Sequence, residues 1–171
     1  MQRVLMVVAL VGACFFTGIR FSERLKNRAA ALRDLRDGIQ TLTSAITHTK
    51  RPLGQIAAEI SKRGASSFWT MFAEHLAAGE DAGDAWGGAL EAATARGGPL
   101  AALMPRDRAL LISFSATLGK TNRQSQAENG QMTLEALSAL IEGADEVYAQ
   151  KGRVYRVLGL FLGLGLGILL W

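Results

Sequence analysis

The sequence is poor in the residues that build catalytic and metal sites. Its one cysteine, Cys14, excludes an intrachain disulfide. The two histidines, His48 and His75, stand in neither an HExxH nor a CxxC context, and no P-loop or GxSxG motif occurs. Acidic residues are scattered on predicted polar faces, which gives no support to catalysis by paired carboxylates. We therefore predict no catalytic residue, no metal site, no cofactor and no enzymatic activity.

Charge is absent from both ends of the chain. Residues 4–19 (VLMVVALVGACFFTGI) and 157–171 (VLGLFLGLGLGILLW) contain no Asp, Glu, Lys or Arg. A helix over residues 154–171 would reach about 27 Å, close to the hydrocarbon core of a bilayer, which is about 30 Å thick. We predict transmembrane anchors at residues 1–20 and 154–171. The alternatives are a buried core helix at the carboxyl end and, at the amino end, a signal peptide cleaved before a lipidated Cys14.

Basic residues gather where the chain leaves both predicted anchors. They are Arg20, Arg24, Lys26, Arg28, Lys151, Arg153 and Arg156. By the positive-inside rule, this placement predicts that residues 21–153 form a domain in the cytoplasm. The same charges would attract anionic lipid headgroups. Proximity to the membrane already explains these basic clusters without a nucleic-acid surface. We therefore expect a lipid bilayer as a partner and no nucleic acid.

Apolar residues recur at helical spacing almost throughout. Leu25, Leu32, Leu35, Ile39, Leu42 and Ile46 form a heptad pattern, and residues 134–155 follow strict three-four spacing. Turn residues separate shorter helices in between, with Ser66 or Ser67 and later Thr121 or Asn122 as candidate caps. The sequence predicts an all-α protein. A cytoplasmic bundle of about six helices contains a long helical hairpin that continues into the N- and C-terminal transmembrane helices.

Three glycines align within the second predicted anchor. Gly159, Gly163 and Gly167 stand at i, i+4 and i+8 and give two overlapping GxxxG units. Such a face allows close packing of helices in a membrane. We expect it to contact the first anchor or a second protein. The sequence leaves open whether the chain forms a homo-oligomer and whether the long helices pair within or between chains.

The stretch LAAGEDAGDAWGGALE, Leu76–Glu91, resembles a turn between two helices in the type II secretion system F domain. Gly79, Glu80 and Gly83 fill the positions of the Gly-Glu-x-x-Gly turn. Over its full length the chain is similar to the stage III sporulation protein AB family. The features that carry this likeness are Pro52-Leu53, Ala85-Trp86, Ala89-Leu90, and Phe114 with Leu118-Gly119.

The resemblance implies a component of the channel between mother cell and forespore in endospore formation. It implies the mother-cell membrane facing the forespore, with the domain on the cytoplasmic side, beside a secretion-type ATPase and other channel membrane proteins. We expect a non-enzymatic membrane scaffold with Trp86 in the core. The expected partner-contact turn comprises Gly79, Glu80, Asp81, Gly83 and Asp84. The alternatives are an F-type platform protein of a pilus or secretion machine and a lipidated extracytoplasmic binding module.

Overall fold

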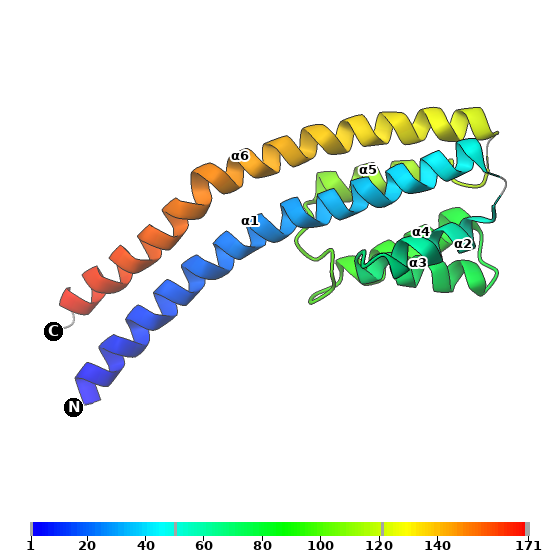
Figure 1. Ribbon diagram of the computed structural model, residues 1–171. Coiled ribbons are helices and arrows are strands. Elements are labelled where there is room, and N and C mark those ends of the chain that lie inside the picture. The colour runs from blue at the N-terminus through cyan, green and yellow to red at the C-terminus, as the bar shows by residue number, and fades with distance from the viewer. Residues whose placement is uncertain (1, 50, 121, 170–171) are drawn as a thin grey trace. The chain divides into compact units, whose positions relative to one another are not determined.

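The computed structural model describes the backbone of residues 2–49, 51–120 and 122–169. Side chains are described in these ranges except at 2–15, 17–18, 152–153, 155–156, 158–160 and 162–169. The helices are α1 (Gln2–His48), α2 (Leu53–Lys62), α3 (Ser67–Ala77), α4 (Ala82–Thr94), α5 (Pro105–Ser115) and α6 (Arg123–Leu169) (Figure 1). No strand occurs in the described ranges, and the prediction of an all-α, six-helix chain is confirmed. The last short helix ends at Ser115, and residues 116–120 form turns.

The chain divides into two compact units. Ala30–Ile141 forms one, here called the helical unit, and Met1–Ala29 with Glu142–Trp171 forms the other, here called the terminal unit. In the helical unit, the inner parts of α1 and α6 pack closely within one chain. A Cβ built on Gly130 would collide with the Thr43 side chain, so a glycine is needed at this crossing. The heptad pattern is confirmed here, since its central residues Leu32, Leu35, Ile39 and Leu42 are fully buried.

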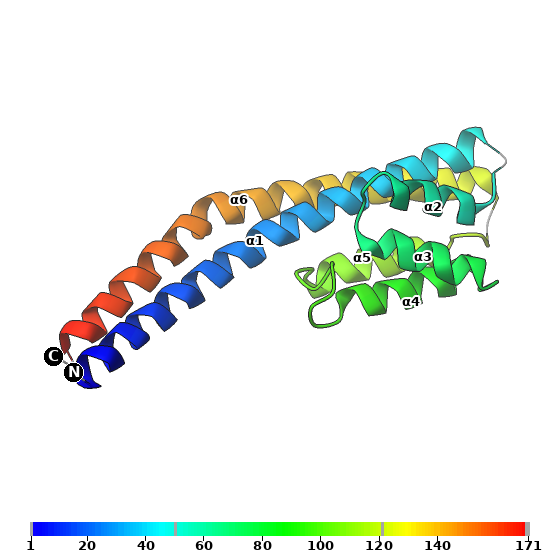
Figure 2. The same cartoon turned by 60° about the horizontal axis from the view of Figure 1, so that its bottom comes forward.

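The short helices pack in chain order, α2 on α3, α3 on α4 and α4 on α5 (Figures 1 and 2). Their core is an aromatic cluster formed by Phe68, Trp69, Phe72, Trp86 and Phe114, each at most 2% exposed. The Trp86 ring lies 4.8 Å from that of Phe68 and 5.1 Å from that of Phe114, both edge-on, as aromatic pairs prefer. Trp86 is therefore a core residue, as predicted.

The predicted polar caps hold at α6 but not at α3. The Asn122 carboxamide oxygen accepts a hydrogen bond from the Ser125 N–H at 2.8 Å, which confirms Asn122 as a cap. The prediction for Ser66 is wrong in part. Ser66 occupies the N-cap position of α3, but its side chain makes no cap hydrogen bond. Its N–H and hydroxyl instead donate to the carboxylate of Asp34, at 3.0 and 2.7 Å, and so join α3 to α1.

The terminal unit contains the outer parts of α1 and α6, which run side by side in both views (Figures 1 and 2). Its exposed large apolar residues include Phe16, Phe21, Val157 and Phe161, and the Arg20 guanidinium lies 5.0 Å from the centre of the Phe16 ring. A search confined to the described residues finds no helix with an apolar stretch long enough to cross a membrane. Most of both predicted anchors lies outside the residues whose side chains are described, and the anchors stay predictions.

Candidate functional site

The predicted contact turn begins with the end of α3. Gly79 has a φ of +88°, in the left-handed region that glycine adopts without strain. Its N–H donates to the Leu76 carbonyl at 3.1 Å, and the Glu80 N–H donates to the His75 carbonyl at 3.3 Å. These two bonds form a Schellman motif, which satisfies the last carbonyls of the helix. The turn is therefore a defined structure and not a loose loop.

Carboxylates then start α4 and surround its first turn. Asp81 is the N-cap, and its side chain accepts a hydrogen bond from the Gly83 N–H at 3.2 Å. It also lies 3.5 Å from the ammonium group of Lys120, while the Glu80 carboxylate lies 2.8 Å from His75 Nδ1. Asp84 is exposed in the first turn of α4. Three carboxylates are thus held at the surface near a helix N-terminus, which favours negative charge.

The two glycines of this turn serve different purposes. Nothing lies within 4 Å of a Cβ built on Gly79, so its constraint is the backbone angle alone. A Cβ on Gly83 would lie 3.2 Å from the carbonyl oxygen of Ser115, at the end of α5. Gly83 is accordingly half-buried and faces the domain, whereas Gly79, Glu80, Asp81 and Asp84 are exposed. The surface that a partner could touch is the acidic part of the turn.

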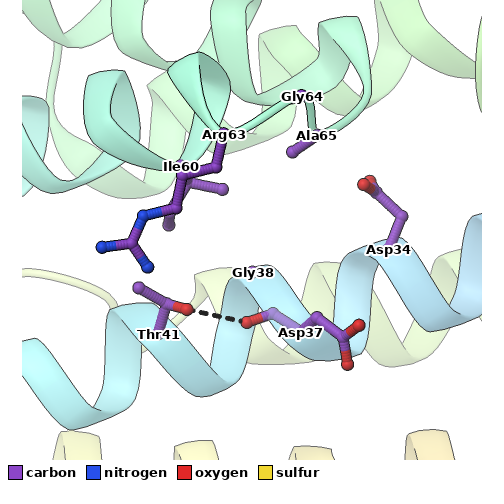
Figure 3. A pocket seen from close by; sticks show the side chains of 8 residues that line it. All are labelled: Asp34, Asp37, Gly38, Thr41, Ile60, Arg63, Gly64 and Ala65. Atoms are coloured by element: carbon purple, nitrogen blue, oxygen red, sulfur yellow. Dashed lines mark hydrogen bonds between the residues drawn. The ribbon is translucent and has the colours of Figure 1, made fainter.

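A groove between α1 and α2 was not expected from the sequence. It encloses about 350 Å³ and is lined by Asp34, Asp37, Gly38, Thr41, Ile60, Arg63, Gly64 and Ala65 (Figure 3). Arg63 extends from α2 toward Thr41 of α1, and the Asp34 carboxylate lies toward Ala65. Asp37, Thr41 and Arg63 also line an adjoining hollow of about 600 Å³ that reaches His48 and Arg51. The groove and this hollow share these three residues and form one continuous concave surface.

Most charged groups in this groove are already engaged. The Glu59 carboxylate receives one hydrogen bond from Arg51, at 2.9 Å, and another from Arg63. These bonds, that of Arg51 first, hold the pKa of Glu59 below its ordinary value. The Asp37 carboxylate accepts from the Arg36 guanidinium at 3.0 Å, and Asp34 accepts from Ser66. The groove is therefore a polar surface whose charges are largely paired within the chain.

Among the described residues, no group of three or more His, Cys, Asp or Glu lies close enough to hold a metal ion. The chemistry that both candidate surfaces offer is recognition through hydrogen bonds and charge. The acidic turn presents fixed carboxylates, and the groove presents guanidinium, hydroxyl and amide groups above a floor that includes buried Ile56 and Ile60.

The predicted membrane-proximal residues fall into three groups. Arg20, Arg24, Lys26 and Lys151 are exposed. Arg28 is only 7% exposed, because its position falls on the buried side of α1 beside Ala29. Arg153 and Arg156, together with the predicted packing glycines Gly159, Gly163 and Gly167, lie outside the residues whose side chains are described.

Comparison with known proteins identifies the family. The family model for stage III sporulation protein AB matches residues 3–171. The chain belongs to the stage III sporulation protein AB family. It is 28% identical to stage III sporulation protein AB of Bacillus subtilis (strain 168) over 174 residues, which cover 99% of each chain. A solved structure of a stage III sporulation protein AB, SpoIIIAB, matches with a TM-score of 0.64 and 25% identity, over 72% of this chain and 97% of the other. The resemblance noted from the sequence is thereby confirmed.

Proposed function

We propose that this chain is a non-enzymatic membrane scaffold with a role in sporulation. It would form part of the channel between mother cell and forespore and couple a secretion-type ATPase to the membrane parts of that channel. The match over residues 3–171 to a family named for stage III of sporulation supports the biological setting. The observation that carries the scaffold role is the acidic turn, where Glu80, Asp81 and Asp84 are exposed on a fixed backbone.

Exposed side chains in the terminal unit support a membrane location. Phe16 and Phe21 are 57% and 51% exposed, and Arg20, Arg24 and Lys26 are exposed close to them. Exposed apolar side chains next to basic ones fit a segment that enters a bilayer, with the apolar groups in the lipid and the basic groups at the headgroups. We place the anchors at residues 1–20 and 154–171 and the domain of residues 21–153 in the cytoplasm, on the mother-cell side. In this arrangement the glycines of the second anchor pack against a neighbouring helix.

The acidic turn is suited to binding a basic partner surface. Its backbone is held by the Schellman motif and by the Asp81 cap, so that few degrees of freedom remain to be lost on binding. Charges at the rim of an interface mainly set the rate and specificity of association. We therefore assign the turn as the contact for the secretion-type ATPase, and the acidic residues as the part that discriminates partners.

The test is a triple variant of the turn, Glu80→Lys, Asp81→Asn and Asp84→Lys. Asparagine at position 81 removes the charge but still caps a helix. We expect this variant to lose co-purification with the channel ATPase from sporulating cells and to lower the yield of heat-resistant spores, while purified protein still unfolds cooperatively on heating. The matched control is Glu91→Lys, at an exposed carboxylate further along α4. Undiminished ATPase binding with full sporulation in the triple variant would remove the proposal.

A further inference from the structure

The outward face of α5 is an exposed apolar stripe. Pro105, Ala109, Ile112 and Ala116 follow each other at intervals of four, three and four residues, and all are exposed. This spacing places them on one side of a helix, and Ala116 keeps helical dihedral angles at the C-cap. Ile112 is 58% exposed. One exposed apolar residue needs no explanation, but a contiguous stripe indicates a contact surface.

Only positive charge lies beside this stripe on α5. Arg106 is exposed on one flank, and Arg108 is half-buried on the other, with one guanidinium nitrogen 3.5 Å from the Thr94 carbonyl oxygen. Asp107, the one acidic residue of α5, is fully buried and accepts a hydrogen bond from the Met104 N–H at 2.8 Å. A helix that covers the stripe should therefore be apolar at its centre and acidic at its edges.

The outward face of α6 in the helical unit combines both kinds of group, with an apolar side chain that has one carboxylate about a turn before it and another about a turn after it. Glu128, Met132, Glu135 and Ala139 are all exposed and are again spaced four, three and four residues apart. Met132 is 69% exposed, and no Lys or Arg occurs from residue 124 to residue 150. Inside one chain, α6 contacts α5 through a different side, where the Asn129 amide donates to the Phe114 carbonyl at 3.3 Å. Both stripes are thus exposed in the part of a single copy that the structure describes.

We propose that the α5 stripe of one copy binds the acidic α6 face of a second copy. Ile112 would pack against Met132, and Arg106 would approach Glu128 or Glu135. The two surfaces differ, so the contact is heterologous, and each copy offers one of each to its neighbours. Repetition of this contact from copy to copy generates a closed ring or an open filament. Self-assembly of this kind does not depend on the ATPase contact proposed above, and either proposal can fail without the other.

Trans crosslinking between two full-length chains tests the contact. In a Cys14→Ser background, one tagged chain carries Ile112→Cys and a second, differently tagged chain carries Met132→Cys. Both are expressed in the same cell and treated with a mild oxidant. We expect a disulfide-linked dimer that carries both tags, because each cysteine is then the only one in its chain. The matched control replaces Met132→Cys by Glu91→Cys, at an exposed position on α4, and should give no dimer.

Charge exchange distinguishes specific binding from chance collision. Arg106→Glu in the first chain should lower the yield of the mixed dimer by about tenfold, since like charges facing each other across an interface are strongly unfavourable. Glu128→Lys with Glu135→Lys in the second chain should restore it. These residues are exposed, so the variants should keep the unfolding temperature of the parent. Absence of the mixed dimer, a yield indifferent to the exchange, a predominant Ile112→Cys homodimer, or linkage to a different protein would each overturn the proposal.

Discussion

Helices α3 and α4 meet in two regions of opposite character. Along their length they bury an aromatic cluster in which Trp69 and Trp86 have no exposed surface. At the end where the chain passes from one helix to the other, Glu80, Asp81 and Asp84 are all exposed. The same pair of helices thus carries a core and a charged surface only a few residues apart. The difference indicates that folding and recognition depend on separate residues of this motif.

Contacts in the aromatic cluster also stabilise the fold more than contacts in the acidic turn do. Each edge-to-face aromatic pair contributes about 0.5–1.5 kcal/mol beyond the burial of its surface. An exposed ion pair such as Lys120–Asp81 contributes about 0–1 kcal/mol. Substitutions in the aromatic cluster should therefore appear as changes in the free energy of unfolding. Substitutions in the turn should appear as changes in binding, with stability largely kept. Substitutions at Gly38, Asp81 and Glu59 test how sharp this division is.

The largest effect on the free energy of unfolding is expected at Gly38, where α1 contacts Trp69 of the aromatic cluster. A Cβ at this position would collide with the Trp69 indole, which has no exposed surface and no space to move into. We expect Gly38→Ala to lower the free energy of unfolding by about 3 kcal/mol, the upper end of the usual cost of overpacking. Chemical denaturation of the purified full-length protein measures this change. A loss below about 0.5 kcal/mol would show that the cluster is less tightly packed than described.

A double-mutant cycle shows whether Trp69 is the cause. The atoms nearest to the added methyl group belong to the six-membered ring of the indole, and a smaller phenyl ring leaves room there. Gly38→Ala should therefore cost much less in a Trp69→Phe background than in the parent. Additive losses in the two single variants would place the strain elsewhere in α1.

Much of the fold could be predicted because its signals are local. Helical spacing, the turn glycines and Asn122 each act within one or two turns of their own position, and the structure confirms the six helices. Gly79 needed only its place between two helices to be read as a left-handed cap. Trp86 could be placed in the core because it stands in the apolar stripe of α4.

The parts that could not be predicted depend on residues far apart in the sequence. Ser66 was expected to cap its own helix, but it donates to Asp34, 32 positions earlier, which no local pattern shows. The groove of Figure 3 arises only when α2 lies across α1, and its residues are ordinary surface residues in sequence. Arg28 was grouped with the membrane-proximal basic residues by its charge and position in sequence. Neither shows that it lies on the buried side of α1.

A smaller effect is expected at Asp81, where the turn itself contributes to stability. Its side chain accepts the Gly83 N–H at the first turn of α4. Asp81→Ala should lower the free energy of unfolding by about 1 kcal/mol, the typical cost of losing a cap, and Asp81→Asn should lower it far less. Thermal unfolding of both variants gives the difference. Equal losses in the two would mean that the charge beside Lys120 matters more than the cap, and the turn would then be less purely a recognition surface.

The smallest effect on stability is expected at Glu59, a surface carboxylate that pairs with two arginines. Hydrogen bonds from Arg51 and then Arg63 hold its pKa below the ordinary value. A carboxylate whose pKa is lower in the folded than in the unfolded state stabilises the protein above the unfolded value, about 4.3, and this contribution is lost as the pH falls through the folded pKa. Below about pH 4.3, the unfolding temperature of the parent should therefore fall more steeply than that of Glu59→Gln. All three side chains are exposed, so the difference should shrink in high salt. Parallel pH curves would show that even this organised surface cluster contributes nothing to folding, which would make the division between core and surface complete.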